Sequence, residues 1–457
     1  MAEVIDFCYE YQYPSAVTQD AIAKCLSLAT FGGEVRSPHF FSGRFVNPKE
    51  AADILLFISA LSRTRFFSPG ELRQRMIAAA DPVVTCDGEQ LRFEVFSVCC
   101  GVYARFDLHA SGLEGSYFSK GTTNVDFNPP MRAALQSITN SDAVGLNVGA
   151  EQLELERGAT RAVEKKVKLP VRWLKGFVEV QIYQSQLAPL LETTGPELAA
   201  VLRSLPEQNL MSAGSISYLT RTEKGLRLSQ RDSAGAVAIG AVNRLKVLQP
   251  IFRYAKGVHI LGGSDGVSSI TIALPDGNVH LVLSPDAARG FSGEGQALKE
   301  LAIKVPPAVL LQVKSALVWS TKIIPSELAS ELSLDHTLVD AALQVFGTRG
   351  LVGFDTSAQA YFHREFPFNS NLVEQLQPRM KKARKILEND GVKILSSSTD
   401  LREATVDGDH ATHLVQLFPG QDSRCTCHWY MKHGGKRGVC AHVLAAELTF
   451  QKLEDDE

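Results

Sequence analysis

The chain of 457 residues contains no apolar run near the length of roughly 20 residues that a membrane-spanning helix needs. Its first six residues also lack the charged and then apolar segments of a secretory signal peptide. We therefore expect a cytoplasmic protein with no membrane partner. The chain also has no excess of positive charge, since its formal net charge is −3, and this excludes a uniformly basic nucleic-acid coat.

The composition is also not that of a disordered chain. Hydrophobic residues make up 45% and charged residues 21% of the chain, as is typical of globular proteins. The sequence shows no internal repeat and no low-complexity tract. With about 150 residues per domain, the length predicts roughly three folding units. We expect a multi-domain α+β protein.

The sequence lacks the phosphate-binding loop G-x-x-x-x-G-K-[ST]. Residues Gly262–Gly266 match the nucleophile motif G-x-S-x-G, which requires a helix after the serine. The following run, Val267–Leu274, alternates as a strand does, so a hairpin turn is the better interpretation. No other nucleophile is paired with a base at a recognisable spacing. The sequence therefore predicts a protein without catalytic residues.

Residues 1–150 show the pattern of an α+β domain. Asn47-Pro48 predicts the start of a helix over Ala51–Ser62, and a similar signal precedes a helix over Glu71–Ala80. Asp87-Gly88 predicts a hairpin between two strands. These strands and the next one are expected at Val83–Cys86, Gln90–Val98 and Val102–Leu108. A polar cluster of Asn124, Asp126 and Arg132 is interpreted as loop bracing, not as a site.

A charged stretch over Glu151–Lys168 indicates a boundary, and residues 169–310 are expected to form a middle α+β domain. Helical patterns occur around Leu187–Leu205. They are followed by an expected three-stranded meander at Val258–Leu261, Val267–Leu274 and Val279–Leu283.

Residues 319–368 resemble a winged helix-turn-helix. The pattern predicts helices over Ser326–Leu332 and Asp335–Phe346, with Leu338, Ala342, Val345 and Phe346 on one face. Wing-like strands are expected at Leu351–Phe354 and Ala360–Phe362. The segment holds three basic and six acidic residues, whereas a helix that enters the major groove of DNA usually brings more arginine and lysine. We therefore interpret it as a protein-docking or structural unit.

A basic linker helix is expected over residues 371–393, and a zinc finger over residues 394–450. Asp407-Gly408 predicts a hairpin that joins Leu401–Val406 to His410–Phe418. The hairpin leads to the pattern C-x-C-x12-C-x-H, formed by Cys425, Cys427, Cys440 and His442. Four such ligands complete a tetrahedral coordination shell, so we expect one structural Zn²⁺ per chain. His433 remains an alternative ligand, whereas His428 is expected to project away.

The pattern C-x-C-x(n)-C-x-H after a β-hairpin, with Trp429-Tyr430 behind the second cysteine, resembles the SWIM zinc finger. Two further runs, Gly121–Arg132 and Leu169–Lys175, are similar to runs in bacterial SWIM-finger proteins. Such proteins are often encoded beside MoxR-type AAA+ ATPases and von Willebrand A-domain proteins. The resemblance implies a bacterial source and these two classes as partners. Ala441 departs from the family, which often has lysine between the last two ligands, and this weakens the argument for a phosphate contact.

Two functions are consistent with these patterns. The first is a non-enzymatic interaction or adaptor protein that works with a MoxR-type ATPase system. The alternative is a DNA- or RNA-binding protein in which basic side chains form a phosphate-binding stripe. The residues of this basic stripe would be Arg379, Lys381, Lys382, Arg384, Lys385, Lys432, Lys436 and Arg437.

Overall fold

The structure is a computed structural model of the whole chain. It describes all residues except 1–6, 10–15, 20–23, 29, 32–38, 67–81, 118, 126, 128, 150–166, 170, 206–214, 264–265, 286–289, 294, 296–297, 299–304, 367–376, 419–421, 436 and 457. The predicted helix over Glu71–Ala80, residue Asp126 of the polar cluster and Lys436 of the basic stripe therefore lie outside the described residues.

The chain divides into two compact units that alternate along the sequence. The first unit holds residues 1–292, 319–323 and 353–367, and the second holds residues 293–318, 324–352 and 368–457. The predicted α+β ranges 1–150 and 169–310 thus fall almost entirely within the first unit. The α+β class of the fold is confirmed, since helices and several β-sheets occur together.

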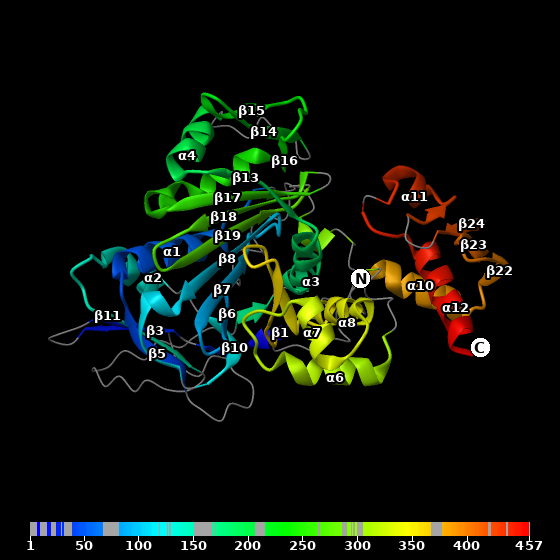
Figure 1. The fold of residues 1–457 in the computed structure, drawn as a ribbon, viewed down its shortest axis with the longest axis horizontal. Coiled ribbons are helices and arrows are strands. Elements are labelled where there is room, and N and C mark those ends of the chain that lie inside the picture. Colours follow the sequence, from blue (N-terminus) through cyan, green and yellow to red (C-terminus); the bar gives the residue numbers. More distant parts are fainter. Residues whose placement is uncertain are drawn as a thin grey trace. The chain divides into compact units, whose positions relative to one another are not determined.

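A nine-stranded antiparallel sheet forms the centre of the first unit (Figure 1). Its order is β13-β17-β18-β19-β8-β7-β6-β10-β4, so strands from both predicted domains share one sheet. The strands are β13 (Ala188–Thr193), β17 (Gly257–Gly262), β18 (Ser268–Ala273), β19 (Gly277–Leu283), β8 (Val102–His109), β7 (Gln90–Phe96), β6 (Val83–Cys86), β10 (Gly121–Val125) and β4 (Thr30–Phe31). The junction is the antiparallel pair of β19 and β8, in which Leu281 lies opposite Ala104.

Smaller sheets flank this one. A five-stranded sheet has the order β2-β3-β11-β5-β9, a three-stranded sheet has the order β15-β14-β16, and β1 pairs with β12. Their strands are β1 (Phe7–Tyr9), β2 (Ala16–Gln19), β3 (Lys24–Leu28), β5 (His39–Phe45), β9 (Leu113–Tyr117), β11 (Val144–Gly149), β12 (Val167–Leu169), β14 (Ile216–Thr222), β15 (Gly225–Ser229) and β16 (Val237–Gly240).

Helices pack against these sheets and against one another. Helix α1 contacts β7, β8 and the long 3-10 helix η2, and α4 contacts η2 and β15. The helices of this unit are α1 (Pro48–Leu61), α2 (Pro129–Ser137), α3 (Val171–Ser185), α4 (Gly195–Ser204), η1 (Ala110–Gly112), η2 (Val242–Tyr254) and η4 (Phe291–Gly293).

Two local expectations for this unit were wrong. Residues 188–193 form strand β13, not part of a helix, and the helix begins only after Thr194, whose side chain accepts a hydrogen bond from the Glu197 amide. Asn47 does not cap α1 with its side chain, because its amide donates to Asp276 at 2.6 Å instead. The hairpin of β6 and β7 and the meander of β17, β18 and β19 are confirmed.

The second unit contains three mutually contacting helices, α6 (Pro307–Leu317), α7 (Pro325–Leu332) and α8 (His336–Thr348). The two helices predicted after residue 319 are thereby confirmed. The strands β20 (Val352–Asp355) and β21 (Ala360–His363) follow as predicted and form a two-stranded sheet. Apart from Val352, these strands belong to the first unit. The winged-helix interpretation therefore stays a prediction.

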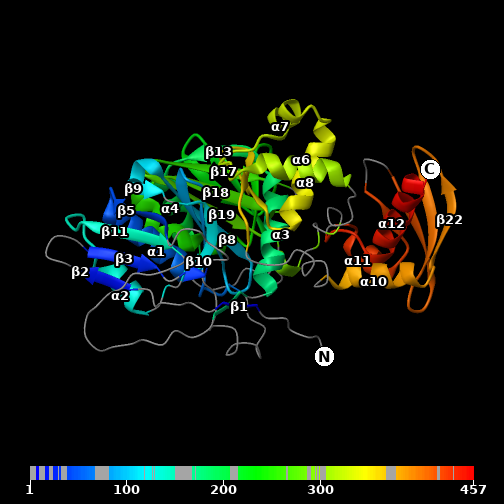
Figure 2. The ribbon, with the colours of Figure 1, turned by 90° about the horizontal axis from the view of Figure 1, so that it is seen from below.

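The C-terminal part of the second unit, residues 377–456, is here called the finger module. It combines a four-stranded antiparallel sheet with helix α12, which contacts the sheet, and helix α10, which contacts α12 (Figure 2). The elements are α10 (Pro378–Glu388), β22 (Val392–Ser397), β23 (Arg402–Asp407), β24 (Thr412–Leu417), β25 (Arg424–Cys425), α11 (His428–His433) and α12 (Ala441–Asp456).

The core of the finger module includes a residue from much earlier in the chain. Leu298 is fully buried together with Met380, Ala404, Val415 and Leu444, which come from one sheet and two helices of the module. The module is therefore not built from a continuous stretch of sequence. Within the described residues, no helix is long and apolar enough to cross a membrane.

Candidate metal centre

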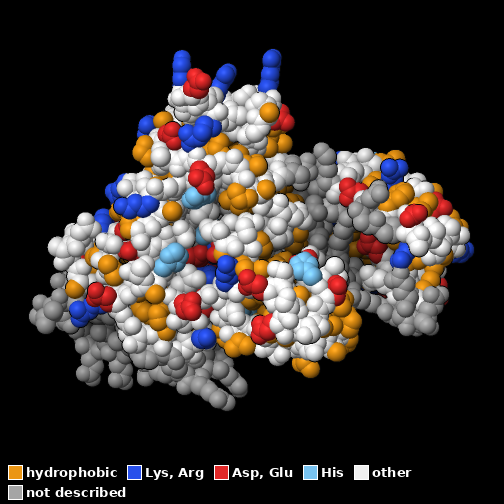
Figure 3. Space-filling model, viewed as in Figure 1, with side chains coloured by type: hydrophobic (Ala, Val, Ile, Leu, Met, Phe, Trp, Pro, Cys, Tyr) orange, Lys and Arg blue, Asp and Glu red, His pale blue; other side chains and the backbone are white. Residues whose placement is uncertain are grey.

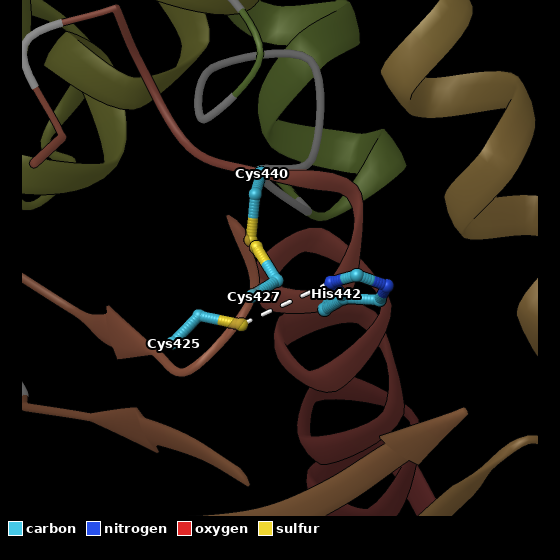
Figure 4. A group of neighbouring side chains, drawn as sticks. All are labelled: Cys425, Cys427, Cys440 and His442. Atoms are coloured by element: carbon cyan, nitrogen blue, oxygen red, sulfur yellow. Dashed lines mark hydrogen bonds between the residues drawn. The ribbon is translucent and has the colours of Figure 1, made fainter. Parts of the chain in front are cut away.

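The four predicted zinc ligands lie together at one end of the finger module (Figure 4). One ligand atom from each of Cys425, Cys427, Cys440 and His442 lies within 4.8 Å of all the others, and all four residues are buried. The Sγ of Cys425 is 3.9 Å from the Nδ1 of His442. In a tetrahedral site with Zn–S bonds of about 2.3 Å, two sulfurs are about 3.8 Å apart. The donor set and the spacing therefore fit zinc after small side-chain rotations.

Local structure places each ligand. Cys425 ends the short strand β25, and Cys427 caps the N-terminus of α11, where its Sγ accepts a hydrogen bond from the Tyr430 amide at 3.4 Å. Cys440 lies immediately before α12, and its Sγ accepts from the Val443 amide at 3.5 Å. His442 is the second residue of α12. Amide donors at these two sulfurs favour thiolate over thiol, which is the form that binds metal.

The thiols also shift one another's ionisation. Hydrogen bonding with Cys425 and Cys440 lowers the pKa of Cys427, whereas hydrogen bonding with Cys427 raises the pKa of Cys425. The pKa of Cys440 is raised to about 11, because the influence of Cys427 and of burial outweighs that of Cys425. Without a cation, the protonated form is thus favoured at Cys425 and Cys440 and the thiolate at Cys427. A divalent cation at their centre would favour all three thiolates at once.

The alternative ligands lie apart from this cluster. His428 is exposed. The ring of His433 lies 4.9 Å from that of Trp429, and its Nε2 is 3.4 Å from a guanidinium nitrogen of Arg437. Neither histidine belongs to the group of four whose ligand atoms converge.

The Nε2 of His442 is buried and has no hydrogen-bond partner among the described residues.

The members of the predicted basic stripe differ in exposure and in their partners. Arg379 is half-buried and donates hydrogen bonds to backbone carbonyls, and Lys382 pairs with Asp409. Arg437 is also half-buried. Four members are exposed: Lys381, Arg384, Lys385 and Lys432. Sequence reasoning missed the structural role of Arg379, because no local signal distinguishes an arginine that contacts backbone carbonyls from one that faces solvent.

A second group of potential ligands lies in the first unit. Asp107, His280 and Asp355 approach one another closely enough to hold a metal. However, one guanidinium nitrogen of Arg105 already lies 2.7 Å from Asp107, 3.0 Å from Asp355 and 3.1 Å from the Nε2 of His280. The guanidinium thus provides the positive charge that a metal ion would otherwise provide to these groups. We assign no metal to this group.

The polar cluster predicted to brace a loop lies partly within the described residues. Arg132 donates to the carbonyl of Phe127 at 2.6 Å, and α2 begins at Pro129. This arrangement agrees with a bracing role for Arg132.

Comparison with known proteins adds little. No protein family matches the sequence, and no curated protein matches it. Among solved structures, the chain is similar to the proliferating cellular nuclear antigen of Entamoeba histolytica, with 9% identity and a TM-score of 0.34. That match covers 54% of this chain and 98% of the other. A similarity this weak supports no conclusion about fold or function, and the resemblance to SWIM fingers stays a prediction.

Proposed function

We propose that the chain is a non-enzymatic interaction protein whose finger module is held together by one structural Zn²⁺. The convergence of three cysteines and one histidine within 4.8 Å carries this proposal. Four protein ligands fill a tetrahedral shell and leave no open position for a substrate, which is the pattern of structural zinc sites. The ion would stabilise the module by joining β25, the start of α11 and the start of α12.

Exposed apolar side chains favour a protein partner over nucleic acid. In the finger module, Met431 is 70% exposed and Leu395 57% exposed, and Ile394, Leu414 and Leu453 are also exposed. Methionine is enriched at protein interfaces, and apolar side chains gain nothing from a phosphate backbone. On the face shown in Figure 3, cations, carboxylates and apolar groups alternate over this module and do not form a uniform basic surface.

The resemblance to SWIM-finger proteins makes a MoxR-type AAA+ ATPase or a von Willebrand A-domain protein the first partner to test. The purified protein would be titrated with each candidate from the same genome by calorimetry, alongside variants Met431→Ser and Leu395→Ser. We expect at least one candidate to bind and the variants to weaken binding by about 1 kcal/mol or more each. Zinc-loaded protein that binds neither candidate would contradict the partner assignment.

DNA or RNA binding is the second candidate function, because Lys381, Arg384, Lys385 and Lys432 are exposed. Labelled single- and double-stranded oligonucleotides would be titrated at two salt concentrations. The adaptor proposal expects only the non-specific affinity of roughly 10⁻⁴ to 10⁻⁶ M at physiological salt. A submicromolar, salt-sensitive complex that is lost on charge reversal of Lys381 and Lys385 would favour nucleic-acid binding instead.

A further inference from the structure

Arg379 connects helix α10 to the loop that carries one of the predicted zinc ligands. Its Nη1 donates hydrogen bonds to the backbone carbonyls of Arg437 at 2.7 Å and Val439 at 2.8 Å. Val439 directly precedes Cys440. Hydrogen bonds from a charged donor are stronger than neutral ones, so this side chain restrains the loop immediately before the ligand.

The same guanidinium also contacts the other half of the metal centre. Its central carbon lies 4.6 Å from the centre of the Trp429 ring, which makes a cation–π contact. Trp429 is in α11, two residues after Cys427. One side chain therefore touches the chain just before the third ligand and just after the second.

Gly295 lies against the guanidinium from a third direction. A Cβ built at this position would lie only 1.8 Å from the Nη2 of Arg379. The backbone of Gly295 does not have a positive φ, so any residue could adopt its conformation and the requirement is one of space. Leu298, three residues later, is buried in the core of the finger module.

We propose that Arg379 is the positioning residue of the metal centre and that the close approach of Gly295 fixes its guanidinium in place. This inference rests on the proposed zinc site. Arg379 holds the Cys440 loop and α11 at the separation that lets the four ligand atoms converge. Its role is thus within the module and is not that of a phosphate contact.

Zinc release from the full-length protein into a chromophoric chelator tests the proposal. We expect Arg379→Met to release zinc about 10-fold faster or more, because residues behind metal ligands change metal affinity by roughly 10- to 100-fold. Arg379→Lys should release zinc at a rate between those of the wild type and Arg379→Met. Lysine keeps the cation–π contact but cannot donate to both carbonyls with the geometry of the guanidinium. Lys381→Met, an exposed change two residues away in α10, is the matched control and should release zinc as the wild type does.

Gly295→Ala provides an independent perturbation of the same contact. We expect it to accelerate zinc release, because the new methyl group must displace the guanidinium. In the double variant with Arg379→Met, the alanine should have no further effect, since the group it would displace is gone. The absorption spectrum of the cobalt-loaded protein should change with Arg379→Met and Gly295→Ala but not with Lys381→Met.

The outcomes separate the two claims. A wild-type protein that holds no zinc would overturn the proposed function. A wild type that holds zinc, with release unchanged in Arg379→Met, would overturn only the positioning role. Additive effects of the glycine and arginine changes would show that Gly295 acts through another contact. If Arg379→Met does not fold, Arg379→Lys and Gly295→Ala decide the question by the same measurement.

Discussion

Arg105 shows how a single buried side chain changes the chemistry of its neighbours. Burial disfavours charge on Asp107, but Arg105 and His280 outweigh it and hold the pKa of this carboxyl well below its usual range. Arg105 also donates to the carbonyl of Phe354 at 2.9 Å and pairs with Asp355. The residue thus binds the β20–β21 segment to the central sheet of the first unit.

We expect Asp107→Asn to destabilise the first unit by about 3–5 kcal/mol, because it leaves a buried arginine without its main counter-charge. The carboxylate stabilises the fold above its unfolded pKa, and this contribution is lost as pH falls through the lowered folded pKa. The penalty should therefore be full at pH 7 and shrink in strong acid. Urea unfolding at several pH values measures it, and a loss below 1 kcal/mol at pH 7 would show that the network relaxes easily.

Glu50 should give the opposite pH dependence. Burial and the nearby Asp276 raise the pKa of this carboxyl from 4.5 to about 7, so the folded chain favours its protonated form. The stability associated with Glu50 is complete below pH 4.5 and is lost as pH rises through about 7. We expect Glu50→Gln to be more stable than the wild type at pH 8, by roughly 1–3 kcal/mol, and to lose this advantage at pH 4.5. Equal differences at both pH values, or a similar gain from the exposed Glu114→Gln, would contradict this cause.

Val318 adopts a left-handed backbone conformation with φ of 32° and is 64% exposed. A β-branched residue is strained there, by roughly 1–2 kcal/mol, whereas glycine is not. Glycine also loses more conformational entropy on folding, and this cost offsets part of the relieved strain. We therefore expect Val318→Gly to stabilise the protein by up to about 1 kcal/mol. Thermal unfolding is the measurement. Val46→Gly, at an exposed valine without positive φ, should be neutral or destabilising.

At the scale of elements, turn chemistry was the most reliable guide. Asp87-Gly88 lies in the connection between β6 and β7, and Asp407-Gly408 spans the end of β23 and the start of its connection to β24, as predicted, because these residues favour tight turns. No pattern in the sequence predicts helix α3, and the helical pattern around Leu187–Leu205 includes the residues that form β13. The state of β13 depends on packing, because it becomes a strand by pairing with β17, which lies more than 60 residues later.

The candidate site was more predictable than the fold around it. The ligand types and spacing are local properties of the sequence, so Cys425, Cys427, Cys440 and His442 could be grouped in advance. The contacts behind them were not predictable. Leu298 and Gly295 lie more than 125 residues before the last ligand, and no single-sequence pattern relates them to it.

Removal of the metal should affect the finger module and not the first unit. We expect chelation to expose the chain after residue 367 to limited proteolysis, because the module depends on the ion to hold β25, α11 and α12 together. The chain at Leu298 should become sensitive to proteolysis as well, since the Leu298 side chain belongs to the core of the finger module. Fragments would be identified by mass spectrometry. Uniform degradation of the whole chain would instead mean that the ion supports both units.

At the scale of the whole molecule, the two units are interleaved along the sequence. The first unit extends to residue 292 and resumes at residues 319–323 and 353–367. Its buried Glu94 pairs with Arg364, 270 positions later, and Arg92 donates to the carbonyl of Thr321 at 3.2 Å. Cutting the chain at a predicted boundary would therefore leave buried charges without partners.

A fragment of residues 1–292 should be much less stable than one of residues 1–367. The shorter fragment lacks Asp355 and Arg364 and so leaves Arg105 and Glu94 incompletely paired in the sheet. Both fragments would be expressed and compared by solubility and thermal unfolding. Equal melting temperatures would show that the later segments contribute little.

The pairing of Glu94 with Arg364 also bears on how the protein is made. A ribosome adds residues in order at about 5–20 per second, so roughly 15 to 50 seconds separate the synthesis of these two side chains. The central sheet receives its last described strand, β19, at residue 283, and from then until residues 353–367 are made Glu94 and Arg105 still lack the partners that come from that segment. The ion pairs of the central sheet can therefore be completed only after the last segment of the first unit has emerged.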